Sequence, residues 1–117
     1  MKGVKMKAKG FLLIVAFCVS AQAADELSLM KFKATNSCQG CDLKGAEFEG
    51  ANLEDANLEG ADLSRAKLEG ADLRYANLTG ASLKDADLRY ANLTGAKLRY
   101  ANLCKTIMPW GEDNSGC

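Results

Sequence analysis

Residues 51–65 read ANLED ANLEG ADLSR, and the same five-residue pattern continues from this stretch in both directions. Leucine or phenylalanine occupies every fifth position between residues 43 and 103. Alanine stands two positions before each of them, except that Cys41 takes its place in the first repeat. Thirteen consecutive repeats follow this template from Cys41 to Lys105. Repetition of this kind is typical of a solenoid, in which each repeat buries its apolar residues against its neighbours.

A period of five is incompatible with both an α-helix and a straight β-strand. On an α-helix each step of five advances about 500°, so the leucines would lie on every face. On a straight strand an odd period sends successive leucines to opposite faces. The alanine and the leucine are two apart, however, and both can point inward from a short extended piece while the other three residues turn a corner.

The sequence therefore predicts a coil that bends every five residues around an apolar interior. Gly45, Gly60 and three other glycines follow the central residue by two positions, as does Gly95, where a corner often needs a positive φ. Successive coils are expected to pair like parallel strands about 4.8 Å apart. The predicted interior ladder consists of Leu43, Phe48, Leu53, Leu58, Leu63, Leu68, Leu73, Leu78, Leu83, Leu88, Leu93, Leu98 and Leu103.

The template resembles that of the pentapeptide-repeat family, Ala-Asn/Asp-Leu followed by two variable positions. The triplets Ala51-Asn52-Leu53, Ala61-Asp62-Leu63 and Ala91-Asn92-Leu93 match it directly, and the resemblance covers residues 41–105. It implies an all-β fold, a right-handed quadrilateral parallel β-helix with four repeats per coil and about three coils. Residue n then lies under residue n+20, which stacks charges of opposite sign. The expected columns are Arg65 with Asp85 and Lys105, Glu47 with Lys67 and Asp87, Glu69 with Arg89, and Glu54 with Arg74.

The two flanks of the repeat are assigned to a leader and to caps. Residues 1–23 combine four lysines, an apolar run and a final Ala-Gln-Ala, the three parts of a secretory signal peptide, so cleavage is expected after Ala23. The apolar run is too short to span a bilayer, and no membrane anchor is expected after cleavage. Residues 24–40 and 106–117 are predicted to be N-terminal and C-terminal caps, because open coil ends expose apolar side chains and unpaired backbone groups. Both flanks resemble family caps. The predicted location is periplasmic or secreted.

Four cysteines remain after the predicted cleavage, and an even number in a small exported domain favours disulfides. Sequence alone leaves three pairings open. In the coil that the family resemblance implies, the N-terminal and C-terminal cysteines are roughly 14 Å apart along the axis. Bridged Cα atoms usually lie within about 7 Å, so we expect Cys104 to pair with Cys117 and Cys38 to pair with Cys41.

The candidate chemistry does not favour an enzyme. A redox dithiol at Cys38-x-x-Cys41 would need a βαβ unit that the repeat cannot supply. A zinc site would need all four sulfurs around one ion, whereas the two pairs fall at opposite ends. The chain has no histidine, and a leucine-filled coil offers no cleft. We expect no catalytic residue, cofactor, metal or small-molecule substrate.

The function predicted from sequence is that of an exported interaction or structural module, with an unknown protein or an anionic envelope polymer as its partner. The possible partner surface consists of the pairs Arg74-Tyr75, Arg89-Tyr90 and Arg99-Tyr100, which could bind an anionic polymer by charge and stacking, or could be ordinary corner residues. The alternative function follows family members that mimic DNA and protect or inhibit DNA gyrase. That role needs a continuous anionic surface and a cytoplasmic location. Residues 41–60 hold six acids and one base, whereas residues 81–100 hold two acids and four bases, so we expect no nucleic-acid role.

Overall fold

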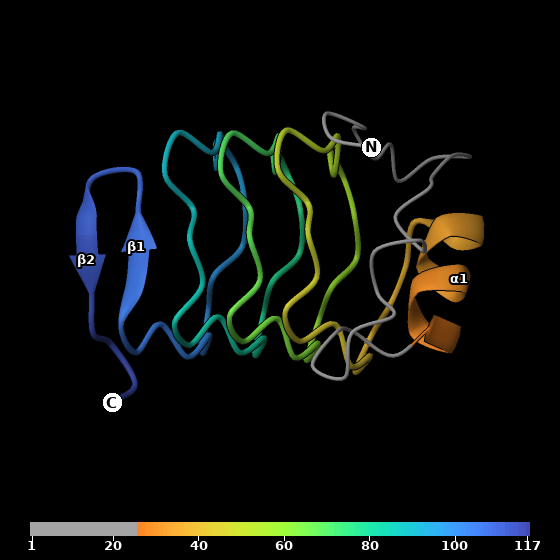
Figure 1. The fold of residues 1–117 in the computed structure, drawn as a ribbon, viewed down its shortest axis with the longest axis horizontal. Helices are drawn as coiled ribbons and strands as arrows, with labels where there is room; N and C mark the ends of the chain where they lie inside the picture. The colour runs from red at the N-terminus through yellow and green to blue at the C-terminus, as the bar shows by residue number, and fades with distance from the viewer. Residues whose placement is uncertain (1–25) are drawn as a thin grey trace.

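A computed structural model describes residues 26–117 as a coil closed at each end by a different element (Figure 1). The helix α1 (Glu26–Thr35) lies at the N-terminal end, and the strands β1 (Thr106–Met108) and β2 (Gly111–Asp113) lie at the other. Between them, parallel bridges join residues twenty apart, such as Asp42 with Asp62. Four repeats therefore complete one coil, as the family resemblance implies. The predicted signal peptide, residues 1–23, lies outside the described residues.

Each corner of the coil is a four-residue β-turn. The Ala46 amide donates to the Leu43 carbonyl at 3.1 Å, and the equivalent bond closes the other corners. The residue before the alanine has a positive φ, as the third residue of a type II turn does. Glycine meets this requirement in six repeats, but the coil imposes the same conformation where glycine is absent. Seven other corner residues have φ between 59° and 62°: Asp55, Arg65, Tyr75, Asp85, Tyr90, Tyr100 and Lys105.

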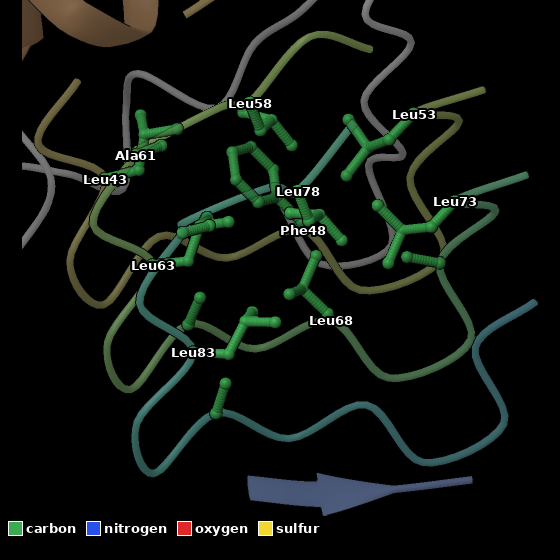
Figure 2. Close-up of a cluster of buried hydrophobic side chains, with 14 of the residues drawn as sticks. Leu43, Phe48, Leu53, Leu58, Ala61, Leu63, Leu68, Leu73, Leu78 and Leu83 are labelled. Carbon is green, nitrogen blue, oxygen red and sulfur yellow. The ribbon is translucent and has the colours of Figure 1, made fainter. Parts of the chain in front are cut away.

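The leucine side chains fill the interior of the coil (Figure 2). Eleven of the thirteen ladder residues are buried, and most of them have no exposed surface. The alanines from Ala46 to Ala91 are buried beside them, which lets neighbouring sides of the coil approach closely. Leu93 and Leu98, in the last coil, are only partly buried. The core is therefore complete in the first coils and incomplete at the C-terminal end.

The coil extends one side beyond each boundary expected from the repeat. Ser37 pairs with Asn57, and buried Cys38 takes the position that leucine holds elsewhere. At the other end Ile107 pairs with Asp87, and Met108 continues the ladder with 1 % of its surface exposed. Residues 36–40 and 106–108 keep the backbone path of a repeat without its leucine, which is why the sequence pattern stops short of them.

The N-terminal cap is the ten-residue helix α1, which the sequence pattern did not indicate. Its Phe32 is completely buried and meets the Phe48 ring edge-on, with ring centroids 6.0 Å apart. The helix thus covers the apolar end of the coil, as a cap must. No helix in the described part of the chain is long and apolar enough to cross a membrane.

The C-terminal cap is an antiparallel hairpin in which Thr106 pairs with Asp113 and Met108 with Gly111. The hydroxyl of Thr106, fully buried, donates to the Leu83 carbonyl at 2.6 Å. After β2 the chain crosses the coil, where the Ser115 carbonyl accepts the Leu103 amide at 2.7 Å. The hairpin therefore covers two sides of the last coil.

Candidate interaction surface

In most repeats the side chain of the residue before the central leucine accepts a hydrogen bond from the backbone. The Oδ1 atom of Asp72, for example, accepts the Arg74 amide at 3.2 Å, which makes an Asx turn. The same bond is made by each asparagine or aspartate at this position, in nine repeats: Asp42, Asn52, Asn57, Asp62, Asp72, Asn77, Asp87, Asn92 and Asn102. The five-residue pattern by itself did not indicate this role. The template's choice of Asn or Asp over other polar residues was the available signal.

Three of the expected ion pairs between adjacent coils are confirmed. Lys67 lies 3.7 Å from Glu47, and Arg74 lies 3.6 Å from Glu54. Arg89 lies 3.8 Å from Glu69. All these side chains are at least one third exposed, so each pair stabilises the coil only weakly. The pairs do, however, arrange charges in a defined pattern on the flat sides of the coil, by which we mean the residues directly before and directly after each central leucine.

The column formed by Arg65, Asp85 and Lys105 behaves differently. Its backbone is stacked as expected, since the Arg65 amide donates to the Lys84 carbonyl at 2.8 Å. Among the described residues, however, none of the three side chains comes within ion-pair distance of another. These three are the positive-φ residues of their turns, whereas every observed ion pair joins residues directly before or directly after a central leucine. The expected alternation of charge is therefore present in position but forms no contact at the corner.

Two arginines make closer contacts that the twenty-residue spacing did not predict. Arg74 Nε and Nη2 donate to the two Asp72 carboxylate oxygens at 2.8 and 2.7 Å. Arg89 binds Asp87 in the same way, at 2.9 and 2.6 Å. These hydrogen bonds hold the pKa of Asp72 and the pKa of Asp87 below the usual value for aspartate. Each arginine consequently joins an acid of its own repeat to an acid of the preceding coil.

The three arginine-tyrosine pairs do not form one surface. Tyr75, Tyr90 and Tyr100 occupy three different corners, and their exposed fractions are 57 %, 79 % and 81 %. Arg74 and Arg89 are already bound to carboxylates. Arg99 instead lies 5.4 Å from the ring centroid of its own neighbour, Tyr100. Only the last of the three pairs has a cation that no carboxylate of the described residues neutralises.

The cysteines lie in two local pairs, each at one end of the coil. The Cα atoms of Cys38 and Cys41 are 5.2 Å apart, and those of Cys104 and Cys117 are 4.7 Å apart. Both separations suit a disulfide. Cys38 and Cys41 are buried beneath α1, and Cys117 links the chain end to the last coil. No group of three or more metal-ligating side chains is found among the residues that the structure describes.

These observations define a class of protein, the right-handed quadrilateral β-helix built from five-residue repeats. A family described as "Pentapeptide repeats (8 copies)" matches residues 37–74 and 71–108, well over half of the chain. The chain belongs to the pentapeptide-repeat family. The matched residues begin and end close to the limits of the stacked coil, at Ser37 and Met108.

Two solved structures illustrate the likeness. One is HetL from the cyanobacterium Nostoc sp. strain PCC 7120, described as involved in heterocyst differentiation regulation, with 45 % identity and a TM-score of 0.61 over 64 % of this chain and 35 % of HetL. The other is a pentapeptide-repeat protein of the Arabidopsis thaliana thylakoid lumen, with 37 % identity and a TM-score of 0.57 over 60 % of this chain and 49 % of that protein. The chain thus spans between a third and a half of their lengths. No curated protein matches it significantly.

Proposed function

We propose that this protein is an exported, non-enzymatic interaction module, whose coil holds surface side chains in a fixed pattern for a partner. The observation that carries the proposal is the anchoring of the flat sides. Asx bonds fix the residue before the central leucine in nine of the thirteen repeats, and Arg74 and Arg89 are each held by two acidic residues. A surface ordered before binding loses less conformational entropy when a partner docks.

The interior supports the same proposal. Leucine and alanine side chains fill the coil and leave the chemistry-bearing residues outside, on water-facing sides. Export is supported by the features of residues 1–23 and by the two cysteine pairs, which suit an oxidising compartment. A similar coil occurs in a thylakoid-lumen protein, so the fold is compatible with a compartment outside the cytoplasm.

Export is tested by fractionating cells that produce the whole chain with a C-terminal tag. We expect the tagged protein outside the cytoplasm, with Ala24 as its first residue by mass spectrometry. A control chain that lacks residues 2–23 should stay in the cytoplasm. Recovery of the whole chain from the cytoplasm with residues 1–23 attached would contradict export.

The interaction role is tested by crosslinking the exported protein in intact cells and identifying captured proteins by mass spectrometry. The double variant Arg74→Glu/Arg89→Glu reverses two anchored cations on the flat sides and should lose the specific partner. Lys44→Glu is the control, because among the described residues its ammonium group makes a single ion pair, at 4.0 Å from Asp62. Capture of the same proteins by all three chains would show that the flat sides are not the binding surface.

A further inference from the structure

Among the described residues, the outer edge of the last coil is hydrogen-bonded on only two of its four sides. From Cys38 to Leu88, every central and corner amide donates to the next coil, as Leu73 does to Asn92 at 2.8 Å. Gly111 then reverses the chain into β2, which pairs with β1, and the segment after β2 returns over Leu103 through Ser115. We call residues 91–100 the open edge. At and beside it, amides that donate to no described residue belong to Tyr90, Leu93, Gly95, Leu98 and Tyr100.

Two carbonyls of the open edge also lack a donor among the described residues, and apolar surface beside them is uncovered. The carbonyls of Ala91 and Ala96 receive none of the described backbone hydrogen bonds, whereas the Ala71 carbonyl one coil earlier accepts the Asn92 amide at 2.9 Å. Leu73 and Leu78 are fully buried, but Leu93 and Leu98 directly above them are only partly buried. The edge therefore offers donors, acceptors and two leucine positions at the spacing of one further strand.

The charge around the open edge indicates what would cover it. Residues 91–105 contain Lys97, Arg99 and Lys105 and no acidic residue. None of these cations makes an ion pair with a described residue, in contrast to Arg74 and Arg89. The Arg99 side chain rests on the Tyr100 ring instead. A covering segment would thus be acidic on its outer face.

We propose that the open edge binds an extended acidic segment of a partner protein, which adds to the last coil as a parallel strand. Strand addition satisfies the free amides and carbonyls, and an apolar side chain at every fifth position would cover Leu93 and Leu98. The proposal rests on the interaction role above and names the partner's chemistry and site. A second copy fits less well, because pairing two open edges would bring like charges together, and α1 closes the opposite end.

The probe is a fluorescein-labelled peptide, AELEGADLDG, titrated into the exported, oxidised protein at low salt and followed by fluorescence anisotropy. We expect saturable binding that weakens as salt is raised, because the cations are exposed. In parallel, amide exchange of the ¹⁵N-labelled protein should slow at Leu93, Gly95, Leu98 and Tyr100 when peptide is present. A peptide bound elsewhere would leave those four amides unchanged, which would overturn the proposal.

Two further peptides separate charge from strand addition. AESEGADSDG keeps the acids but lacks the leucines, and AKLKGAKLKG keeps the leucines but reverses the charge. Both should bind at least tenfold more weakly than the probe. Equal binding of the first would show simple charge attraction, and equal binding of the second would remove the acidic requirement. Either result would contradict the proposal.

The variant Lys97→Glu/Arg99→Glu should weaken probe binding at least tenfold. Its control is Lys44→Glu/Lys84→Glu, the same charge change on another side of the coil, which should alter binding less than twofold. If the probe fails while crosslinking still captures a partner through the flat sides, the open-edge proposal is wrong and the interaction role stands. A stable dimer that protects the same four amides would identify a second copy as the occupant and also overturn the proposal.

Discussion

At the scale of single residues, the repeat is specified by more than its leucines. Asparagine and aspartate before the leucine are chosen because their Oδ1 atom accepts the amide two residues later, which holds the chain in the turn. Glu47 and Lys67 occupy the same position without making such a bond, so their repeats rely on stacking alone. The outer surface therefore contributes to the backbone path as well as to charge.

Asp87 both accepts the Arg89 amide and binds the Arg89 guanidinium, and two substitutions separate these roles. Asp87→Asn keeps an Oδ1 acceptor for the Arg89 amide but loses the two-pronged bond to the guanidinium. Because that pair is exposed, we expect the melting temperature to fall by at most about 4 °C. Asp87→Ala loses both bonds and should melt at a lower temperature than Asp87→Asn. Equal melting temperatures for the two variants would mean that the Asx bond contributes nothing.

The lowered pKa of Asp72 and of Asp87 gives the same contacts a pH dependence. The folded-state pKa of each lies below the unfolded value, near 3.9, because Arg74 and Arg89 stabilise the charged carboxylates. Their contribution to stability is therefore complete above about pH 4 and is lost as the pH falls through the folded-state pKa. The wild type should lose more stability between pH 6 and pH 2.5 than Asp72→Asn/Asp87→Asn does, measured by urea unfolding. Identical losses would contradict this assignment.

Gly95 shows how a corner of one coil constrains the corner stacked on it in the following coil. A Cβ atom added at Gly95 would overlap the Tyr75 ring, whereas one at Gly80 would meet no atom within 4 Å. Both glycines have a positive φ, so alanine at either costs about 1–2 kcal/mol in backbone strain. We expect Gly95→Ala to destabilise more than Gly80→Ala in chemical denaturation. The excess should disappear in a Tyr75→Ala background, and its persistence there would show that the ring is not its cause.

At the scale of elements, the two ends of the coil are closed by unlike caps. Helix α1 inserts Phe32 against Phe48, whereas the β1–β2 hairpin extends one side of the ladder with Met108. The repeat determines neither cap, because neither segment carries the five-residue pattern. Each cap is accompanied by one of the cysteine pairs, which suggests that the ends need the additional restraint most.

The Cys104–Cys117 pair is expected to be oxidised in the exported protein, and closing this loop should contribute about 3 kcal/mol. Non-reducing peptide mapping should show one linked peptide from Cys104 with Cys117 and another from Cys38 with Cys41. Cys104→Ser/Cys117→Ser should reduce the free energy of unfolding by about that amount while leaving the first coils folded. A peptide that joins an N-terminal to a C-terminal cysteine would contradict the stacked coil itself.

At the scale of the whole molecule, the coil is nearly one-dimensional, so stability depends on position along its axis. Leu73 is fully buried in the second coil, and Leu98 is partly buried in the last. We expect Leu73→Ala to cost about 2–5 kcal/mol and Leu98→Ala clearly less, by urea unfolding. Equal costs would show that Leu98 is covered in solution, for instance by a bound segment or a second copy.

The sequence alone determined the repeat, the inward ladder and the position of every corner, because a five-residue period with apolar residues two apart admits few other backbone paths. Ala51-Asn52-Leu53 and its equivalents also indicated the family, and the four repeats per coil that this resemblance implies gave the pairs Glu47–Lys67 and Glu54–Arg74. Interactions between residues that are close in sequence, or that recur at a fixed period, can be predicted from the sequence pattern.

Only the tertiary structure decided what happens where the period fails. Residues 26–35 form a helix because Phe32 finds the exposed end of the coil at Phe48, a contact that no local pattern encodes. Arg74 and Arg89 lie closer to Asp72 and Asp87 of their own repeats than to the glutamates of the preceding coil, and with these aspartates they form two-pronged hydrogen bonds. The open edge exists because the hairpin reverses at Gly111, and a reversal is set by contacts across the fold. The five-residue period fixed the coil, and packing between residues outside that period fixed its two ends.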